Sequence, residues 1–239
     1  NSDEVGNEER GEWDTMVLSQ LRSHSKLYRA LDAASGLPLA RFEAESCSQM
    51  PALRISDLPQ KVRRNAMYYR NRAQRLGSLE LTVADRSSWE EAFEALQRLH
   101  TSRWEERGEP GVLEDPRVLA WHREAMPLLI EGGMLRLCAL RLDGQVIAVL
   151  YSLIDPPWRG ERTQYFYLTA YSTEHAELRP GTLLLAYAIE RAAEEGVTVI
   201  DNLRGSEAYK QIWHMQRSTT FGFTMTRSAY RGREERAVA

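Results

Sequence analysis

The chain has 239 residues, of which 43% are apolar and 27% charged, and its formal net charge is -3. This length suits one large domain or two small ones, and the balanced composition excludes general disorder and a whole-surface role in binding polyanions. Cys47 and Cys138 lack CxxC spacing, which argues against a disulfide framework or a thiolate metal site and favours a reducing, cytoplasmic setting. Apolar runs such as residues 146–151 are far shorter than the roughly 20 residues of a membrane span, and no signal-peptide pattern opens the chain.

The first half of the chain alternates between strand and helix patterns. Residues 1–12 are acidic and polar, so we expect them to be disordered, and the absence of an initial Met suggests that upstream residues are missing. The patterns predict strands at 13–21, 39–44 and 78–84, and helices at 25–35, 55–77, 87–108 and 115–133, the last with a kink or break at Pro127. We assign 13–84 and 85–227 to separate units.

The second half begins with a predicted hairpin. Residues 134–142 and 145–154 flank Asp143 and Gly144, a pair typical of a type I′ turn because both positions need positive φ angles. A strand at 163–171, a helix at 182–196, a strand at 197–201, a short helix at 206–213 and a strand at 219–228 follow. The order after residue 134 is therefore strand, strand, strand, helix, strand, helix, strand, and residues 228–239 form a charged tail.

Common catalytic signatures are absent from the sequence. It contains no GxGxxG or GxxxxGK[ST] loop, no GxSxG nucleophile turn and no HExxH zinc helix. The histidines are scattered without ligand spacing, which indicates structural roles rather than a metal site; they are His24, His100, His122, His175 and His214. We therefore expect no bound metal.

Residues 179–182, with the sequence RPGT, precede the helix at 182–196. Proline suits a first helical turn, glycine lets another group approach the backbone, and the first N–H groups of a helix can hold an anion. The same residues also fit a simple helix start. Both interpretations stay open from the residues alone.

The predicted helix at 55–77 is unusually basic. Its cations, with no acid between them, are Lys61, Arg63, Arg64, Arg70, Arg72 and Arg75. Such a helix repels itself unless something anionic lies against it, either an external ligand or acidic neighbours such as Glu90, Glu91 and Glu94.

The stretch DNLRGSEAYKQIW, residues 201–213, crowds polar groups into the loop after a strand. Ligands commonly bind at strand ends of α/β sheets, so these groups are candidates for a functional site. Alternatively, Asp201 caps the short helix and Tyr209 packs.

Four motifs in one order resemble the GNAT acyltransferase superfamily, and within it the CelD-like branch beside cellulose-biosynthesis loci, related to Fem-type aminoacyl transferases. The motifs are VRRNAMYYRNR (62–72), LHTSRWEERGEPG (99–111), PGTLLLAYAIE (180–190) and LRGSEAYKQIW (203–213). The resemblance implies an α/β fold with a mixed, mostly antiparallel sheet flanked by helices, and often two such halves in tandem. Residues 13–84 would then be the remnant of a first half, and 85–227 the acyltransferase domain.

The resemblance also implies a reaction: transfer of an acyl group, typically acetyl, from acyl-CoA as co-substrate to an amine or hydroxyl of a small molecule or saccharide-type acceptor. The family's diphosphate loop reads Q/R-x-x-G-x-G, and this chain departs from it with Ala176 and Arg179 at the first two signature positions. Fem-type enzymes depart here too and take their acyl group from aminoacyl-tRNA, which the basic helix would suit. A non-catalytic module that binds a polysaccharide-synthesis partner or phosphorylated carrier is a further alternative, and a nucleic-acid binder a third.

The resemblance assigns roles to particular residues. Backbone N–H groups between Leu168 and Ala170 would hold the acyl carbonyl oxygen, and Arg179, Gly181, Thr182 and Asn202 would bind acyl-CoA. Asp201 or Glu207 would deprotonate the acceptor and Tyr209 would protonate the leaving group. The expected contacts to anionic parts of the substrates come from Arg204, Lys210, Arg64 and Arg70.

Overall fold

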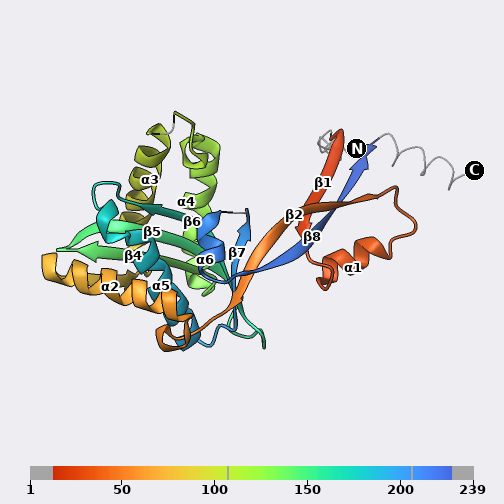
Figure 1. Cartoon of the computed structure of the whole chain (residues 1–239). Helices are drawn as coiled ribbons and strands as arrows, with labels where there is room; N and C mark the ends of the chain where they lie inside the picture. The colour runs from red at the N-terminus through yellow and green to blue at the C-terminus, as the bar shows by residue number, and fades with distance from the viewer. Residues whose placement is uncertain (1–12, 107, 206, 228–239) are drawn as a thin grey trace, which may run out of the picture. The chain divides into compact units, whose positions relative to one another are not determined.

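The computed structural model describes residues 13–106, 108–205 and 207–227 (Figure 1). Its strands are β1 (Thr15–Leu21), β2 (Ala40–Pro51), β3 (Leu79–Val83), β4 (Leu135–Leu142), β5 (Gln145–Ile154), β6 (Thr163–Tyr171), β7 (Val199–Arg204) and β8 (Gln216–Thr226). Its α-helices are α1 (Lys26–Asp32), α2 (Gln60–Leu76), α3 (Trp89–Glu105), α4 (Pro116–Glu131), α5 (Pro180–Glu194) and α6 (Ala208–Ile212). Short 3-10 turns are η1 (Ile55–Asp57), η2 (Val112–Glu114) and η3 (Ala176–Leu178).

The strands join in the order β1-β8-β2-β7-β6-β5-β4-β3. Strand β1 pairs antiparallel with β8, and β3, β4, β5 and β6 pair antiparallel in succession, whereas β6 and β7 are parallel. The predicted α/β class with a mixed, mostly antiparallel sheet is confirmed, as is the element order from β4 to β8.

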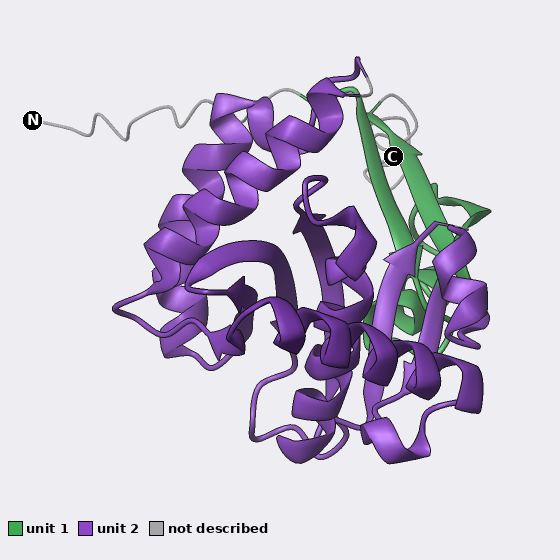
Figure 2. Cartoon of the chain, turned by 60° about the vertical axis from the view of Figure 1, so that its left-hand side comes forward, with its two compact units in different colours: residues 1–47, 218–239 green, residues 48–217 purple. Residues whose placement is uncertain are grey.

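The chain divides into two compact units, residues 1–47 with 218–239 and residues 48–217 (Figure 2). In the first unit, Tyr28 of α1 packs against Phe221 and Phe223 of β8, with ring centroids 5.3 and 5.6 Å apart. Buried Thr220 donates its hydroxyl to the Glu45 carbonyl at 2.7 Å. That residues 13–84 descend from a first acyltransferase half stays a prediction.

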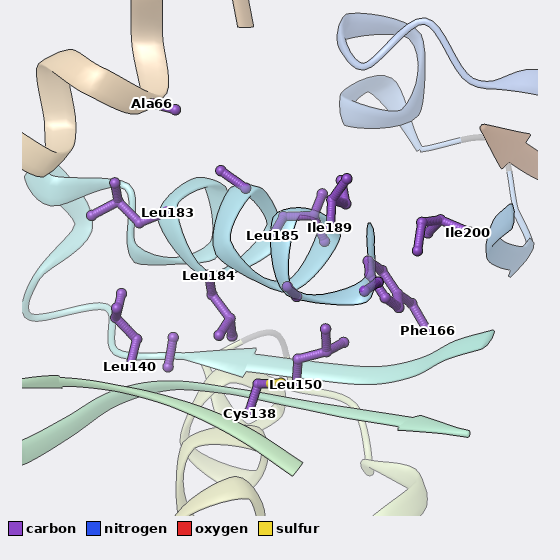
Figure 3. Packing of buried hydrophobic residues seen from close by; sticks show 14 of the residues in the cluster. Ala66, Cys138, Leu140, Leu150, Phe166, Leu183, Leu184, Leu185, Ile189 and Ile200 are labelled. Atoms are coloured by element: carbon purple, nitrogen blue, oxygen red, sulfur yellow. The ribbon is translucent and has the colours of Figure 1, made fainter. Parts of the chain in front are cut away.

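The second unit is a sheet covered on both faces. Helices α2 and α5 cover one face, where alternate strand residues such as Leu140 and Leu150 meet Leu184 of α5. Figure 3 shows Leu184 pointing from α5 toward these strands. On the other face α3 and α4 pack through Phe93 and Met126 against a different set of strand residues. Period-two alternation of β4 and β5 thus supplies both cores.

The predicted hairpin is confirmed. Leu142 pairs with Gln145 around the two-residue turn, in which Asp143 and Gly144 have φ angles of 49° and 79°. Both are positive, as a type I′ turn requires.

Several predicted boundaries differ from the structure; the strand expected at 39–44, for example, extends to Pro51 as β2. The helix expected at 55–77 is divided, because Pro59 separates η1 from α2. Helix α4 runs through Pro127 without a break, since proline removes only one N–H and Met126 beside it is fully buried. Strand β7 reaches Arg204 rather than ending at residue 201, which brings Asn202 into the strand.

The described residues contain neither a membrane-spanning helix nor a cluster of metal ligands. None of the helices in residues 13–106, 108–205 and 207–227 is long and apolar enough to span a membrane. The same residues contain no group of three or more His, Cys, Asp and Glu side chains that could hold a metal ion.

Candidate active site

The sheet opens between β6 and β7. Parallel pairs join Thr163 to Val199, Gln164 to Ile200 and Tyr165 to Asp201, and the pairing then ends although β6 continues to Tyr171. Beyond Tyr165 the two strands therefore leave backbone groups on their facing edges that the ladder does not use. Free amides at such a gap can bind an oxyanion or an extended ligand.

A β-bulge lies where the gap begins. Tyr151 of β5 pairs with Leu168 and the next residue, Ser152, pairs with Phe166, so Tyr167 is the extra residue. A bulge bends the strand and re-aims the residues after it. Leu168 and Ala170, predicted at the acyl carbonyl, both lie in the splayed part of β6, and Ala170 is fully buried.

Tyr209 of α6 reaches back to β7. Its hydroxyl donates to Oδ1 of Asn202 at 3.3 Å. Burial, and then the charge of Glu207, raise the pKa of Tyr209 to about 12, against a smaller opposing effect of Arg103. The phenol therefore keeps its proton at neutral pH, as a proton donor must. Asn202 is buried, and within the described residues its Nδ2 has no hydrogen-bond partner.

Both carboxylates predicted as bases have internal partners. Asp201 is 1% exposed; its Oδ1 accepts from the Leu203 amide at 2.8 Å, and its Oδ2 accepts from Gln49 at 3.4 Å. Glu207 forms an ion pair with Lys210 at 2.9 Å. Partial burial acts to raise the pKa of Glu207, but the hydrogen bond and charge of Lys210 lower it overall.

Lys210 holds the loop between β7 and α6 together. Its side chain is buried, and Nζ donates to the carbonyls of Arg204 at 2.7 Å, Gly205 at 3.3 Å and Leu203 at 3.5 Å. The loop needs such support because Leu203 has a φ of 53°, a strained value for a branched side chain. These contacts favour a loop-supporting role for Lys210, whereas Arg204 is exposed and available to a ligand.

The predicted anion-binding turn begins α5. Arg179 adopts left-handed angles, φ 48° and ψ 54°, at the position where the family's motif has glycine. Its carbonyl accepts from the amides of Thr182 at 2.9 Å and Leu183 at 3.2 Å. Gly181 lies so close to Tyr171 that an added Cβ would be 3.1 Å from the ring. Arg179 differs from the glycine of the family motif, yet it adopts the left-handed backbone conformation that glycine would give.

Arg103 of α3 is a site residue that the sequence analysis missed. Its guanidinium lies over the Tyr171 ring, 4.6 Å from the ring centroid, and its charge acts to lower the pKa of Tyr209. Helix α3 thus places a cation between the α5 turn and α6. The residue stands in the motif LHTSRWEERGEPG, yet helical spacing alone predicted only a core-packing face there.

The basic helix α2 packs against α5 and η3. Arg70 lies over the Tyr187 ring at 5.6 Å, Arg63 donates to the Ser56 carbonyl at 2.7 Å, and Arg64 is exposed. Across the described chain no carboxylate forms an ion pair with a cation of α2, and this includes Glu90, Glu91 and Glu94. Within the described residues, therefore, none of the cations of α2 is held in a direct ion pair by an acidic neighbour.

A cavity of about 860 Å³ lies beside the bulged strand, between α3, η2, the start of α4 and β6. Its lining includes His100 and Trp104 of α3, Gly111, and Leu168 of β6. Sequence reasoning assigned His100 a structural role, and the structure places it on the wall of this cavity. Leu168 connects the cavity to the splayed strand.

Comparisons with known proteins agree with this architecture. A 14% identical conserved protein of unknown function from Bacteroides thetaiotaomicron VPI-5482 superposes with a TM-score of 0.62, over 88% of this chain and 69% of that one. The C-terminal domain (DUF2156) of a putative lysylphosphatidylglycerol synthetase from Agrobacterium fabrum is 12% identical and superposes with a TM-score of 0.59, over 89% of this chain and 67% of that one. FemX is 11% identical, and its structure superposes with a TM-score of 0.58, over 83% of this chain and 65% of that one. The chain thus spans about two thirds of the length of these proteins, and at such identities they share the fold alone.

A search of curated proteins found no match. The family model described as "Acetyltransferase (GNAT) domain", however, matches residues 60–211, from the start of α2 into α6. This range contains the β6/β7 gap, the α5 turn and Tyr209. The chain therefore belongs to the GNAT acetyltransferase-domain family.

Proposed function

We propose that this protein transfers an acyl group, typically acetyl, from acyl-CoA to an amine or hydroxyl of a small molecule or saccharide-type acceptor. The observation that carries the proposal is the gap between β6 and β7 with a protonated Tyr209 at its edge. The thioester would lie along the free edge of β6, and amides between Leu168 and Ala170 would hold its carbonyl oxygen. A role in polysaccharide synthesis, implied by the CelD-like resemblance, belongs to this proposal.

In the proposed reaction, Tyr209, Asn202 and the α5 turn have separate roles. The acceptor's lone pair forms a bond to the acyl carbon, and its proton passes to a base, for which the resemblance suggests Asp201 or Glu207. The C–S bond breaks, the thiolate takes the proton of the Tyr209 hydroxyl, and solvent then returns a proton to the Tyr209 phenolate. Asn202 orients that hydroxyl through its 3.3 Å hydrogen bond. The α5 turn, with Gly181, Thr182 and the exposed Arg179, would hold the diphosphate of CoA.

Replacing Tyr209 with Phe tests the proposal. Loss of the proton donor should lower acetyl transfer by more than about tenfold, with an unchanged melting temperature. Release of CoA thiol, measured across a panel of amine and hydroxyl acceptors, checks this. The matched control is Tyr68→Phe, since Tyr68 is an exposed tyrosine of α2. An unchanged rate in Tyr209→Phe would remove Tyr209 from the mechanism.

A second candidate is a Fem-type transferase that uses aminoacyl-tRNA. The cations of α2, which form no ion pair with the described carboxylates and belong to a helix that packs against α5, favour it because they could neutralise phosphates. Titration of the protein with acetyl-CoA and with a charged tRNA separates the two donors. If a folded protein binds neither, the third candidate, a non-catalytic binding module, is favoured.

A further inference from the structure

His100 occupies an unusual position in α3. It is 4% exposed, yet it lines the cavity of about 860 Å³ that Leu168 of the splayed strand also lines. Trp104, one turn further along α3, lies against the imidazole with ring centroids 5.8 Å apart. The ring is therefore packed against Trp104 in a cavity that reaches the proposed acyl site at Leu168.

The hydrogen bonding of His100 is incomplete. Its Nδ1 is buried and has no partner anywhere in the described parts of the chain. A buried polar atom without a partner costs about 1–3 kcal/mol, and Nε2 of His122 is in the same condition among the described residues. Because Nδ1 of His100 is closed to solvent, a ligand in the cavity would have to bond Nε2, the other ring nitrogen.

Gly111 provides the space for this ring. An added Cβ there would lie 2.4 Å from Cε1 and 2.7 Å from Nδ1 of His100. The backbone does not require glycine, since φ is -83° and ψ is 151°. The small residue is therefore explained by the imidazole beside it.

Burial keeps the His100 ring neutral near pH 7. It lowers the pKa of His100 below the ordinary value of 6.5; Glu114 of η2 acts to raise this pKa, and Arg103 has a smaller lowering effect. From α4, Arg117 faces the cavity paired with Asp115 at 3.0 Å, and β6 contributes the apolar Leu168. A neutral imidazole can accept a proton.

We infer that His100 is a catalytic base and that the cavity beside it is the acceptor site. The inference rests on the proposed acyl transfer and deepens it. It fills a position that Asp201 and Glu207 fit less well, because both carboxylates bond to internal groups. Of these three side chains, only that of His100 lines the cavity.

The proton balance of the step is simple. As the acceptor's oxygen or nitrogen bonds to the acyl carbon, its proton passes to the imidazole of His100. The departing thiolate takes the proton of Tyr209, and the imidazolium then loses its proton to solvent while the phenolate regains one. No other reactant is needed.

Two variants test the role of His100. His100→Gln should lower the turnover of acetyl transfer by about 100-fold, the lower end of the usual range for proton transfer, with little change in acetyl-CoA affinity. Gly111→Ala keeps the imidazole but displaces it, and should lower turnover in the same way. The matched control is His122→Gln: His122 is also buried, has a pKa lowered by burial, and does not line the cavity. Its turnover should stay within about threefold.

The pH profile separates catalysis from structure. The wild-type rate should fall as pH drops through the pKa of His100, below 6.5, because only the neutral ring accepts a proton. This acid limb should vanish in His100→Gln, and added imidazole should restore part of the rate of His100→Ala. Turnover of His100→Gln within threefold of wild type, or an unchanged acid limb, would overturn the inference while leaving acyl transfer intact. A folded wild-type protein that neither binds nor consumes acetyl-CoA would instead overturn the proposed function, and this inference with it.

Discussion

The two faces of the sheet in residues 48–217 differ in how their cores are filled. Under α2 and α5 the core is mostly aliphatic, with Leu140, Leu150 and Leu184 fully buried. Under α3 and α4 it includes two buried histidines, each with a ring nitrogen that lacks a partner in the described chain. One face thus stabilises the fold, while the other tolerates polar groups beside a cavity and the splayed strand. The core under α2 and α5 and the proposed acceptor site thus lie on opposite sides of one sheet.

The largest effect is expected on the aliphatic face. Leu184→Ala should lower the free energy of unfolding by about 2–5 kcal/mol, since it leaves a cavity in a close-packed core. Leu128→Ala in α4 is the control, because Leu128 is 70% exposed and should cost less than about 0.5 kcal/mol. Urea unfolding measures both. Equal losses would contradict the assignment of the main stabilising core to α5.

A smaller effect is expected in the loop after β7. Lys210→Met should destabilise the protein by roughly 1–3 kcal/mol, because the carbonyls that Lys210 contacts lose a charged donor. Arg204→Met, a change of an exposed side chain, should stay within about 0.5 kcal/mol. If Arg204→Met is as damaging as Lys210→Met, the loop-supporting role of Lys210 is wrong.

The histidine face should also respond to pH, by an amount smaller than either substitution. Burial lowers the pKa of both His100 and His122, so below about pH 6.5 the unfolded chain takes up protons that the folded chain does not. Stability should therefore fall as pH decreases from 6.5 toward the folded pKa values. Urea unfolding at several pH values measures this, and His122→Gln should flatten the dependence. An identical slope in that variant would show that His122 is not involved.

Local chemistry predicted much of the fold. The Asp143–Gly144 pair determines its own turn, and the apolar patterns on either side of it predicted strands β4 and β5. The bulge at Tyr167 could not be predicted, because it depends on how β6 registers against β5. The end of β7 at Arg204 was also missed, because the polar residues after Ile200 are typical of a loop.

The candidate site was predicted unevenly. Asn202 and Tyr209 were identified seven residues apart, and the structure joins them by a hydrogen bond. His100 was interpreted as structural because one histidine on a helix carries no spacing signal. Its signal was a pair: His100 and Gly111 both stand in LHTSRWEERGEPG, but only the folded chain shows that the glycine makes room for the ring.

The central claim, an acyl-donor site at the β6/β7 gap and the α5 turn, is tested most directly by calorimetric titration of the protein with acetyl-CoA. We predict saturable binding with one site per chain, weakened at least tenfold in Gly181→Val, whose side chain would meet Tyr171 and obstruct the turn. Gly160→Val, at a glycine with no neighbour within 4 Å, should bind as the wild type does. A folded wild-type protein that shows no binding of acetyl-CoA would contradict the claim.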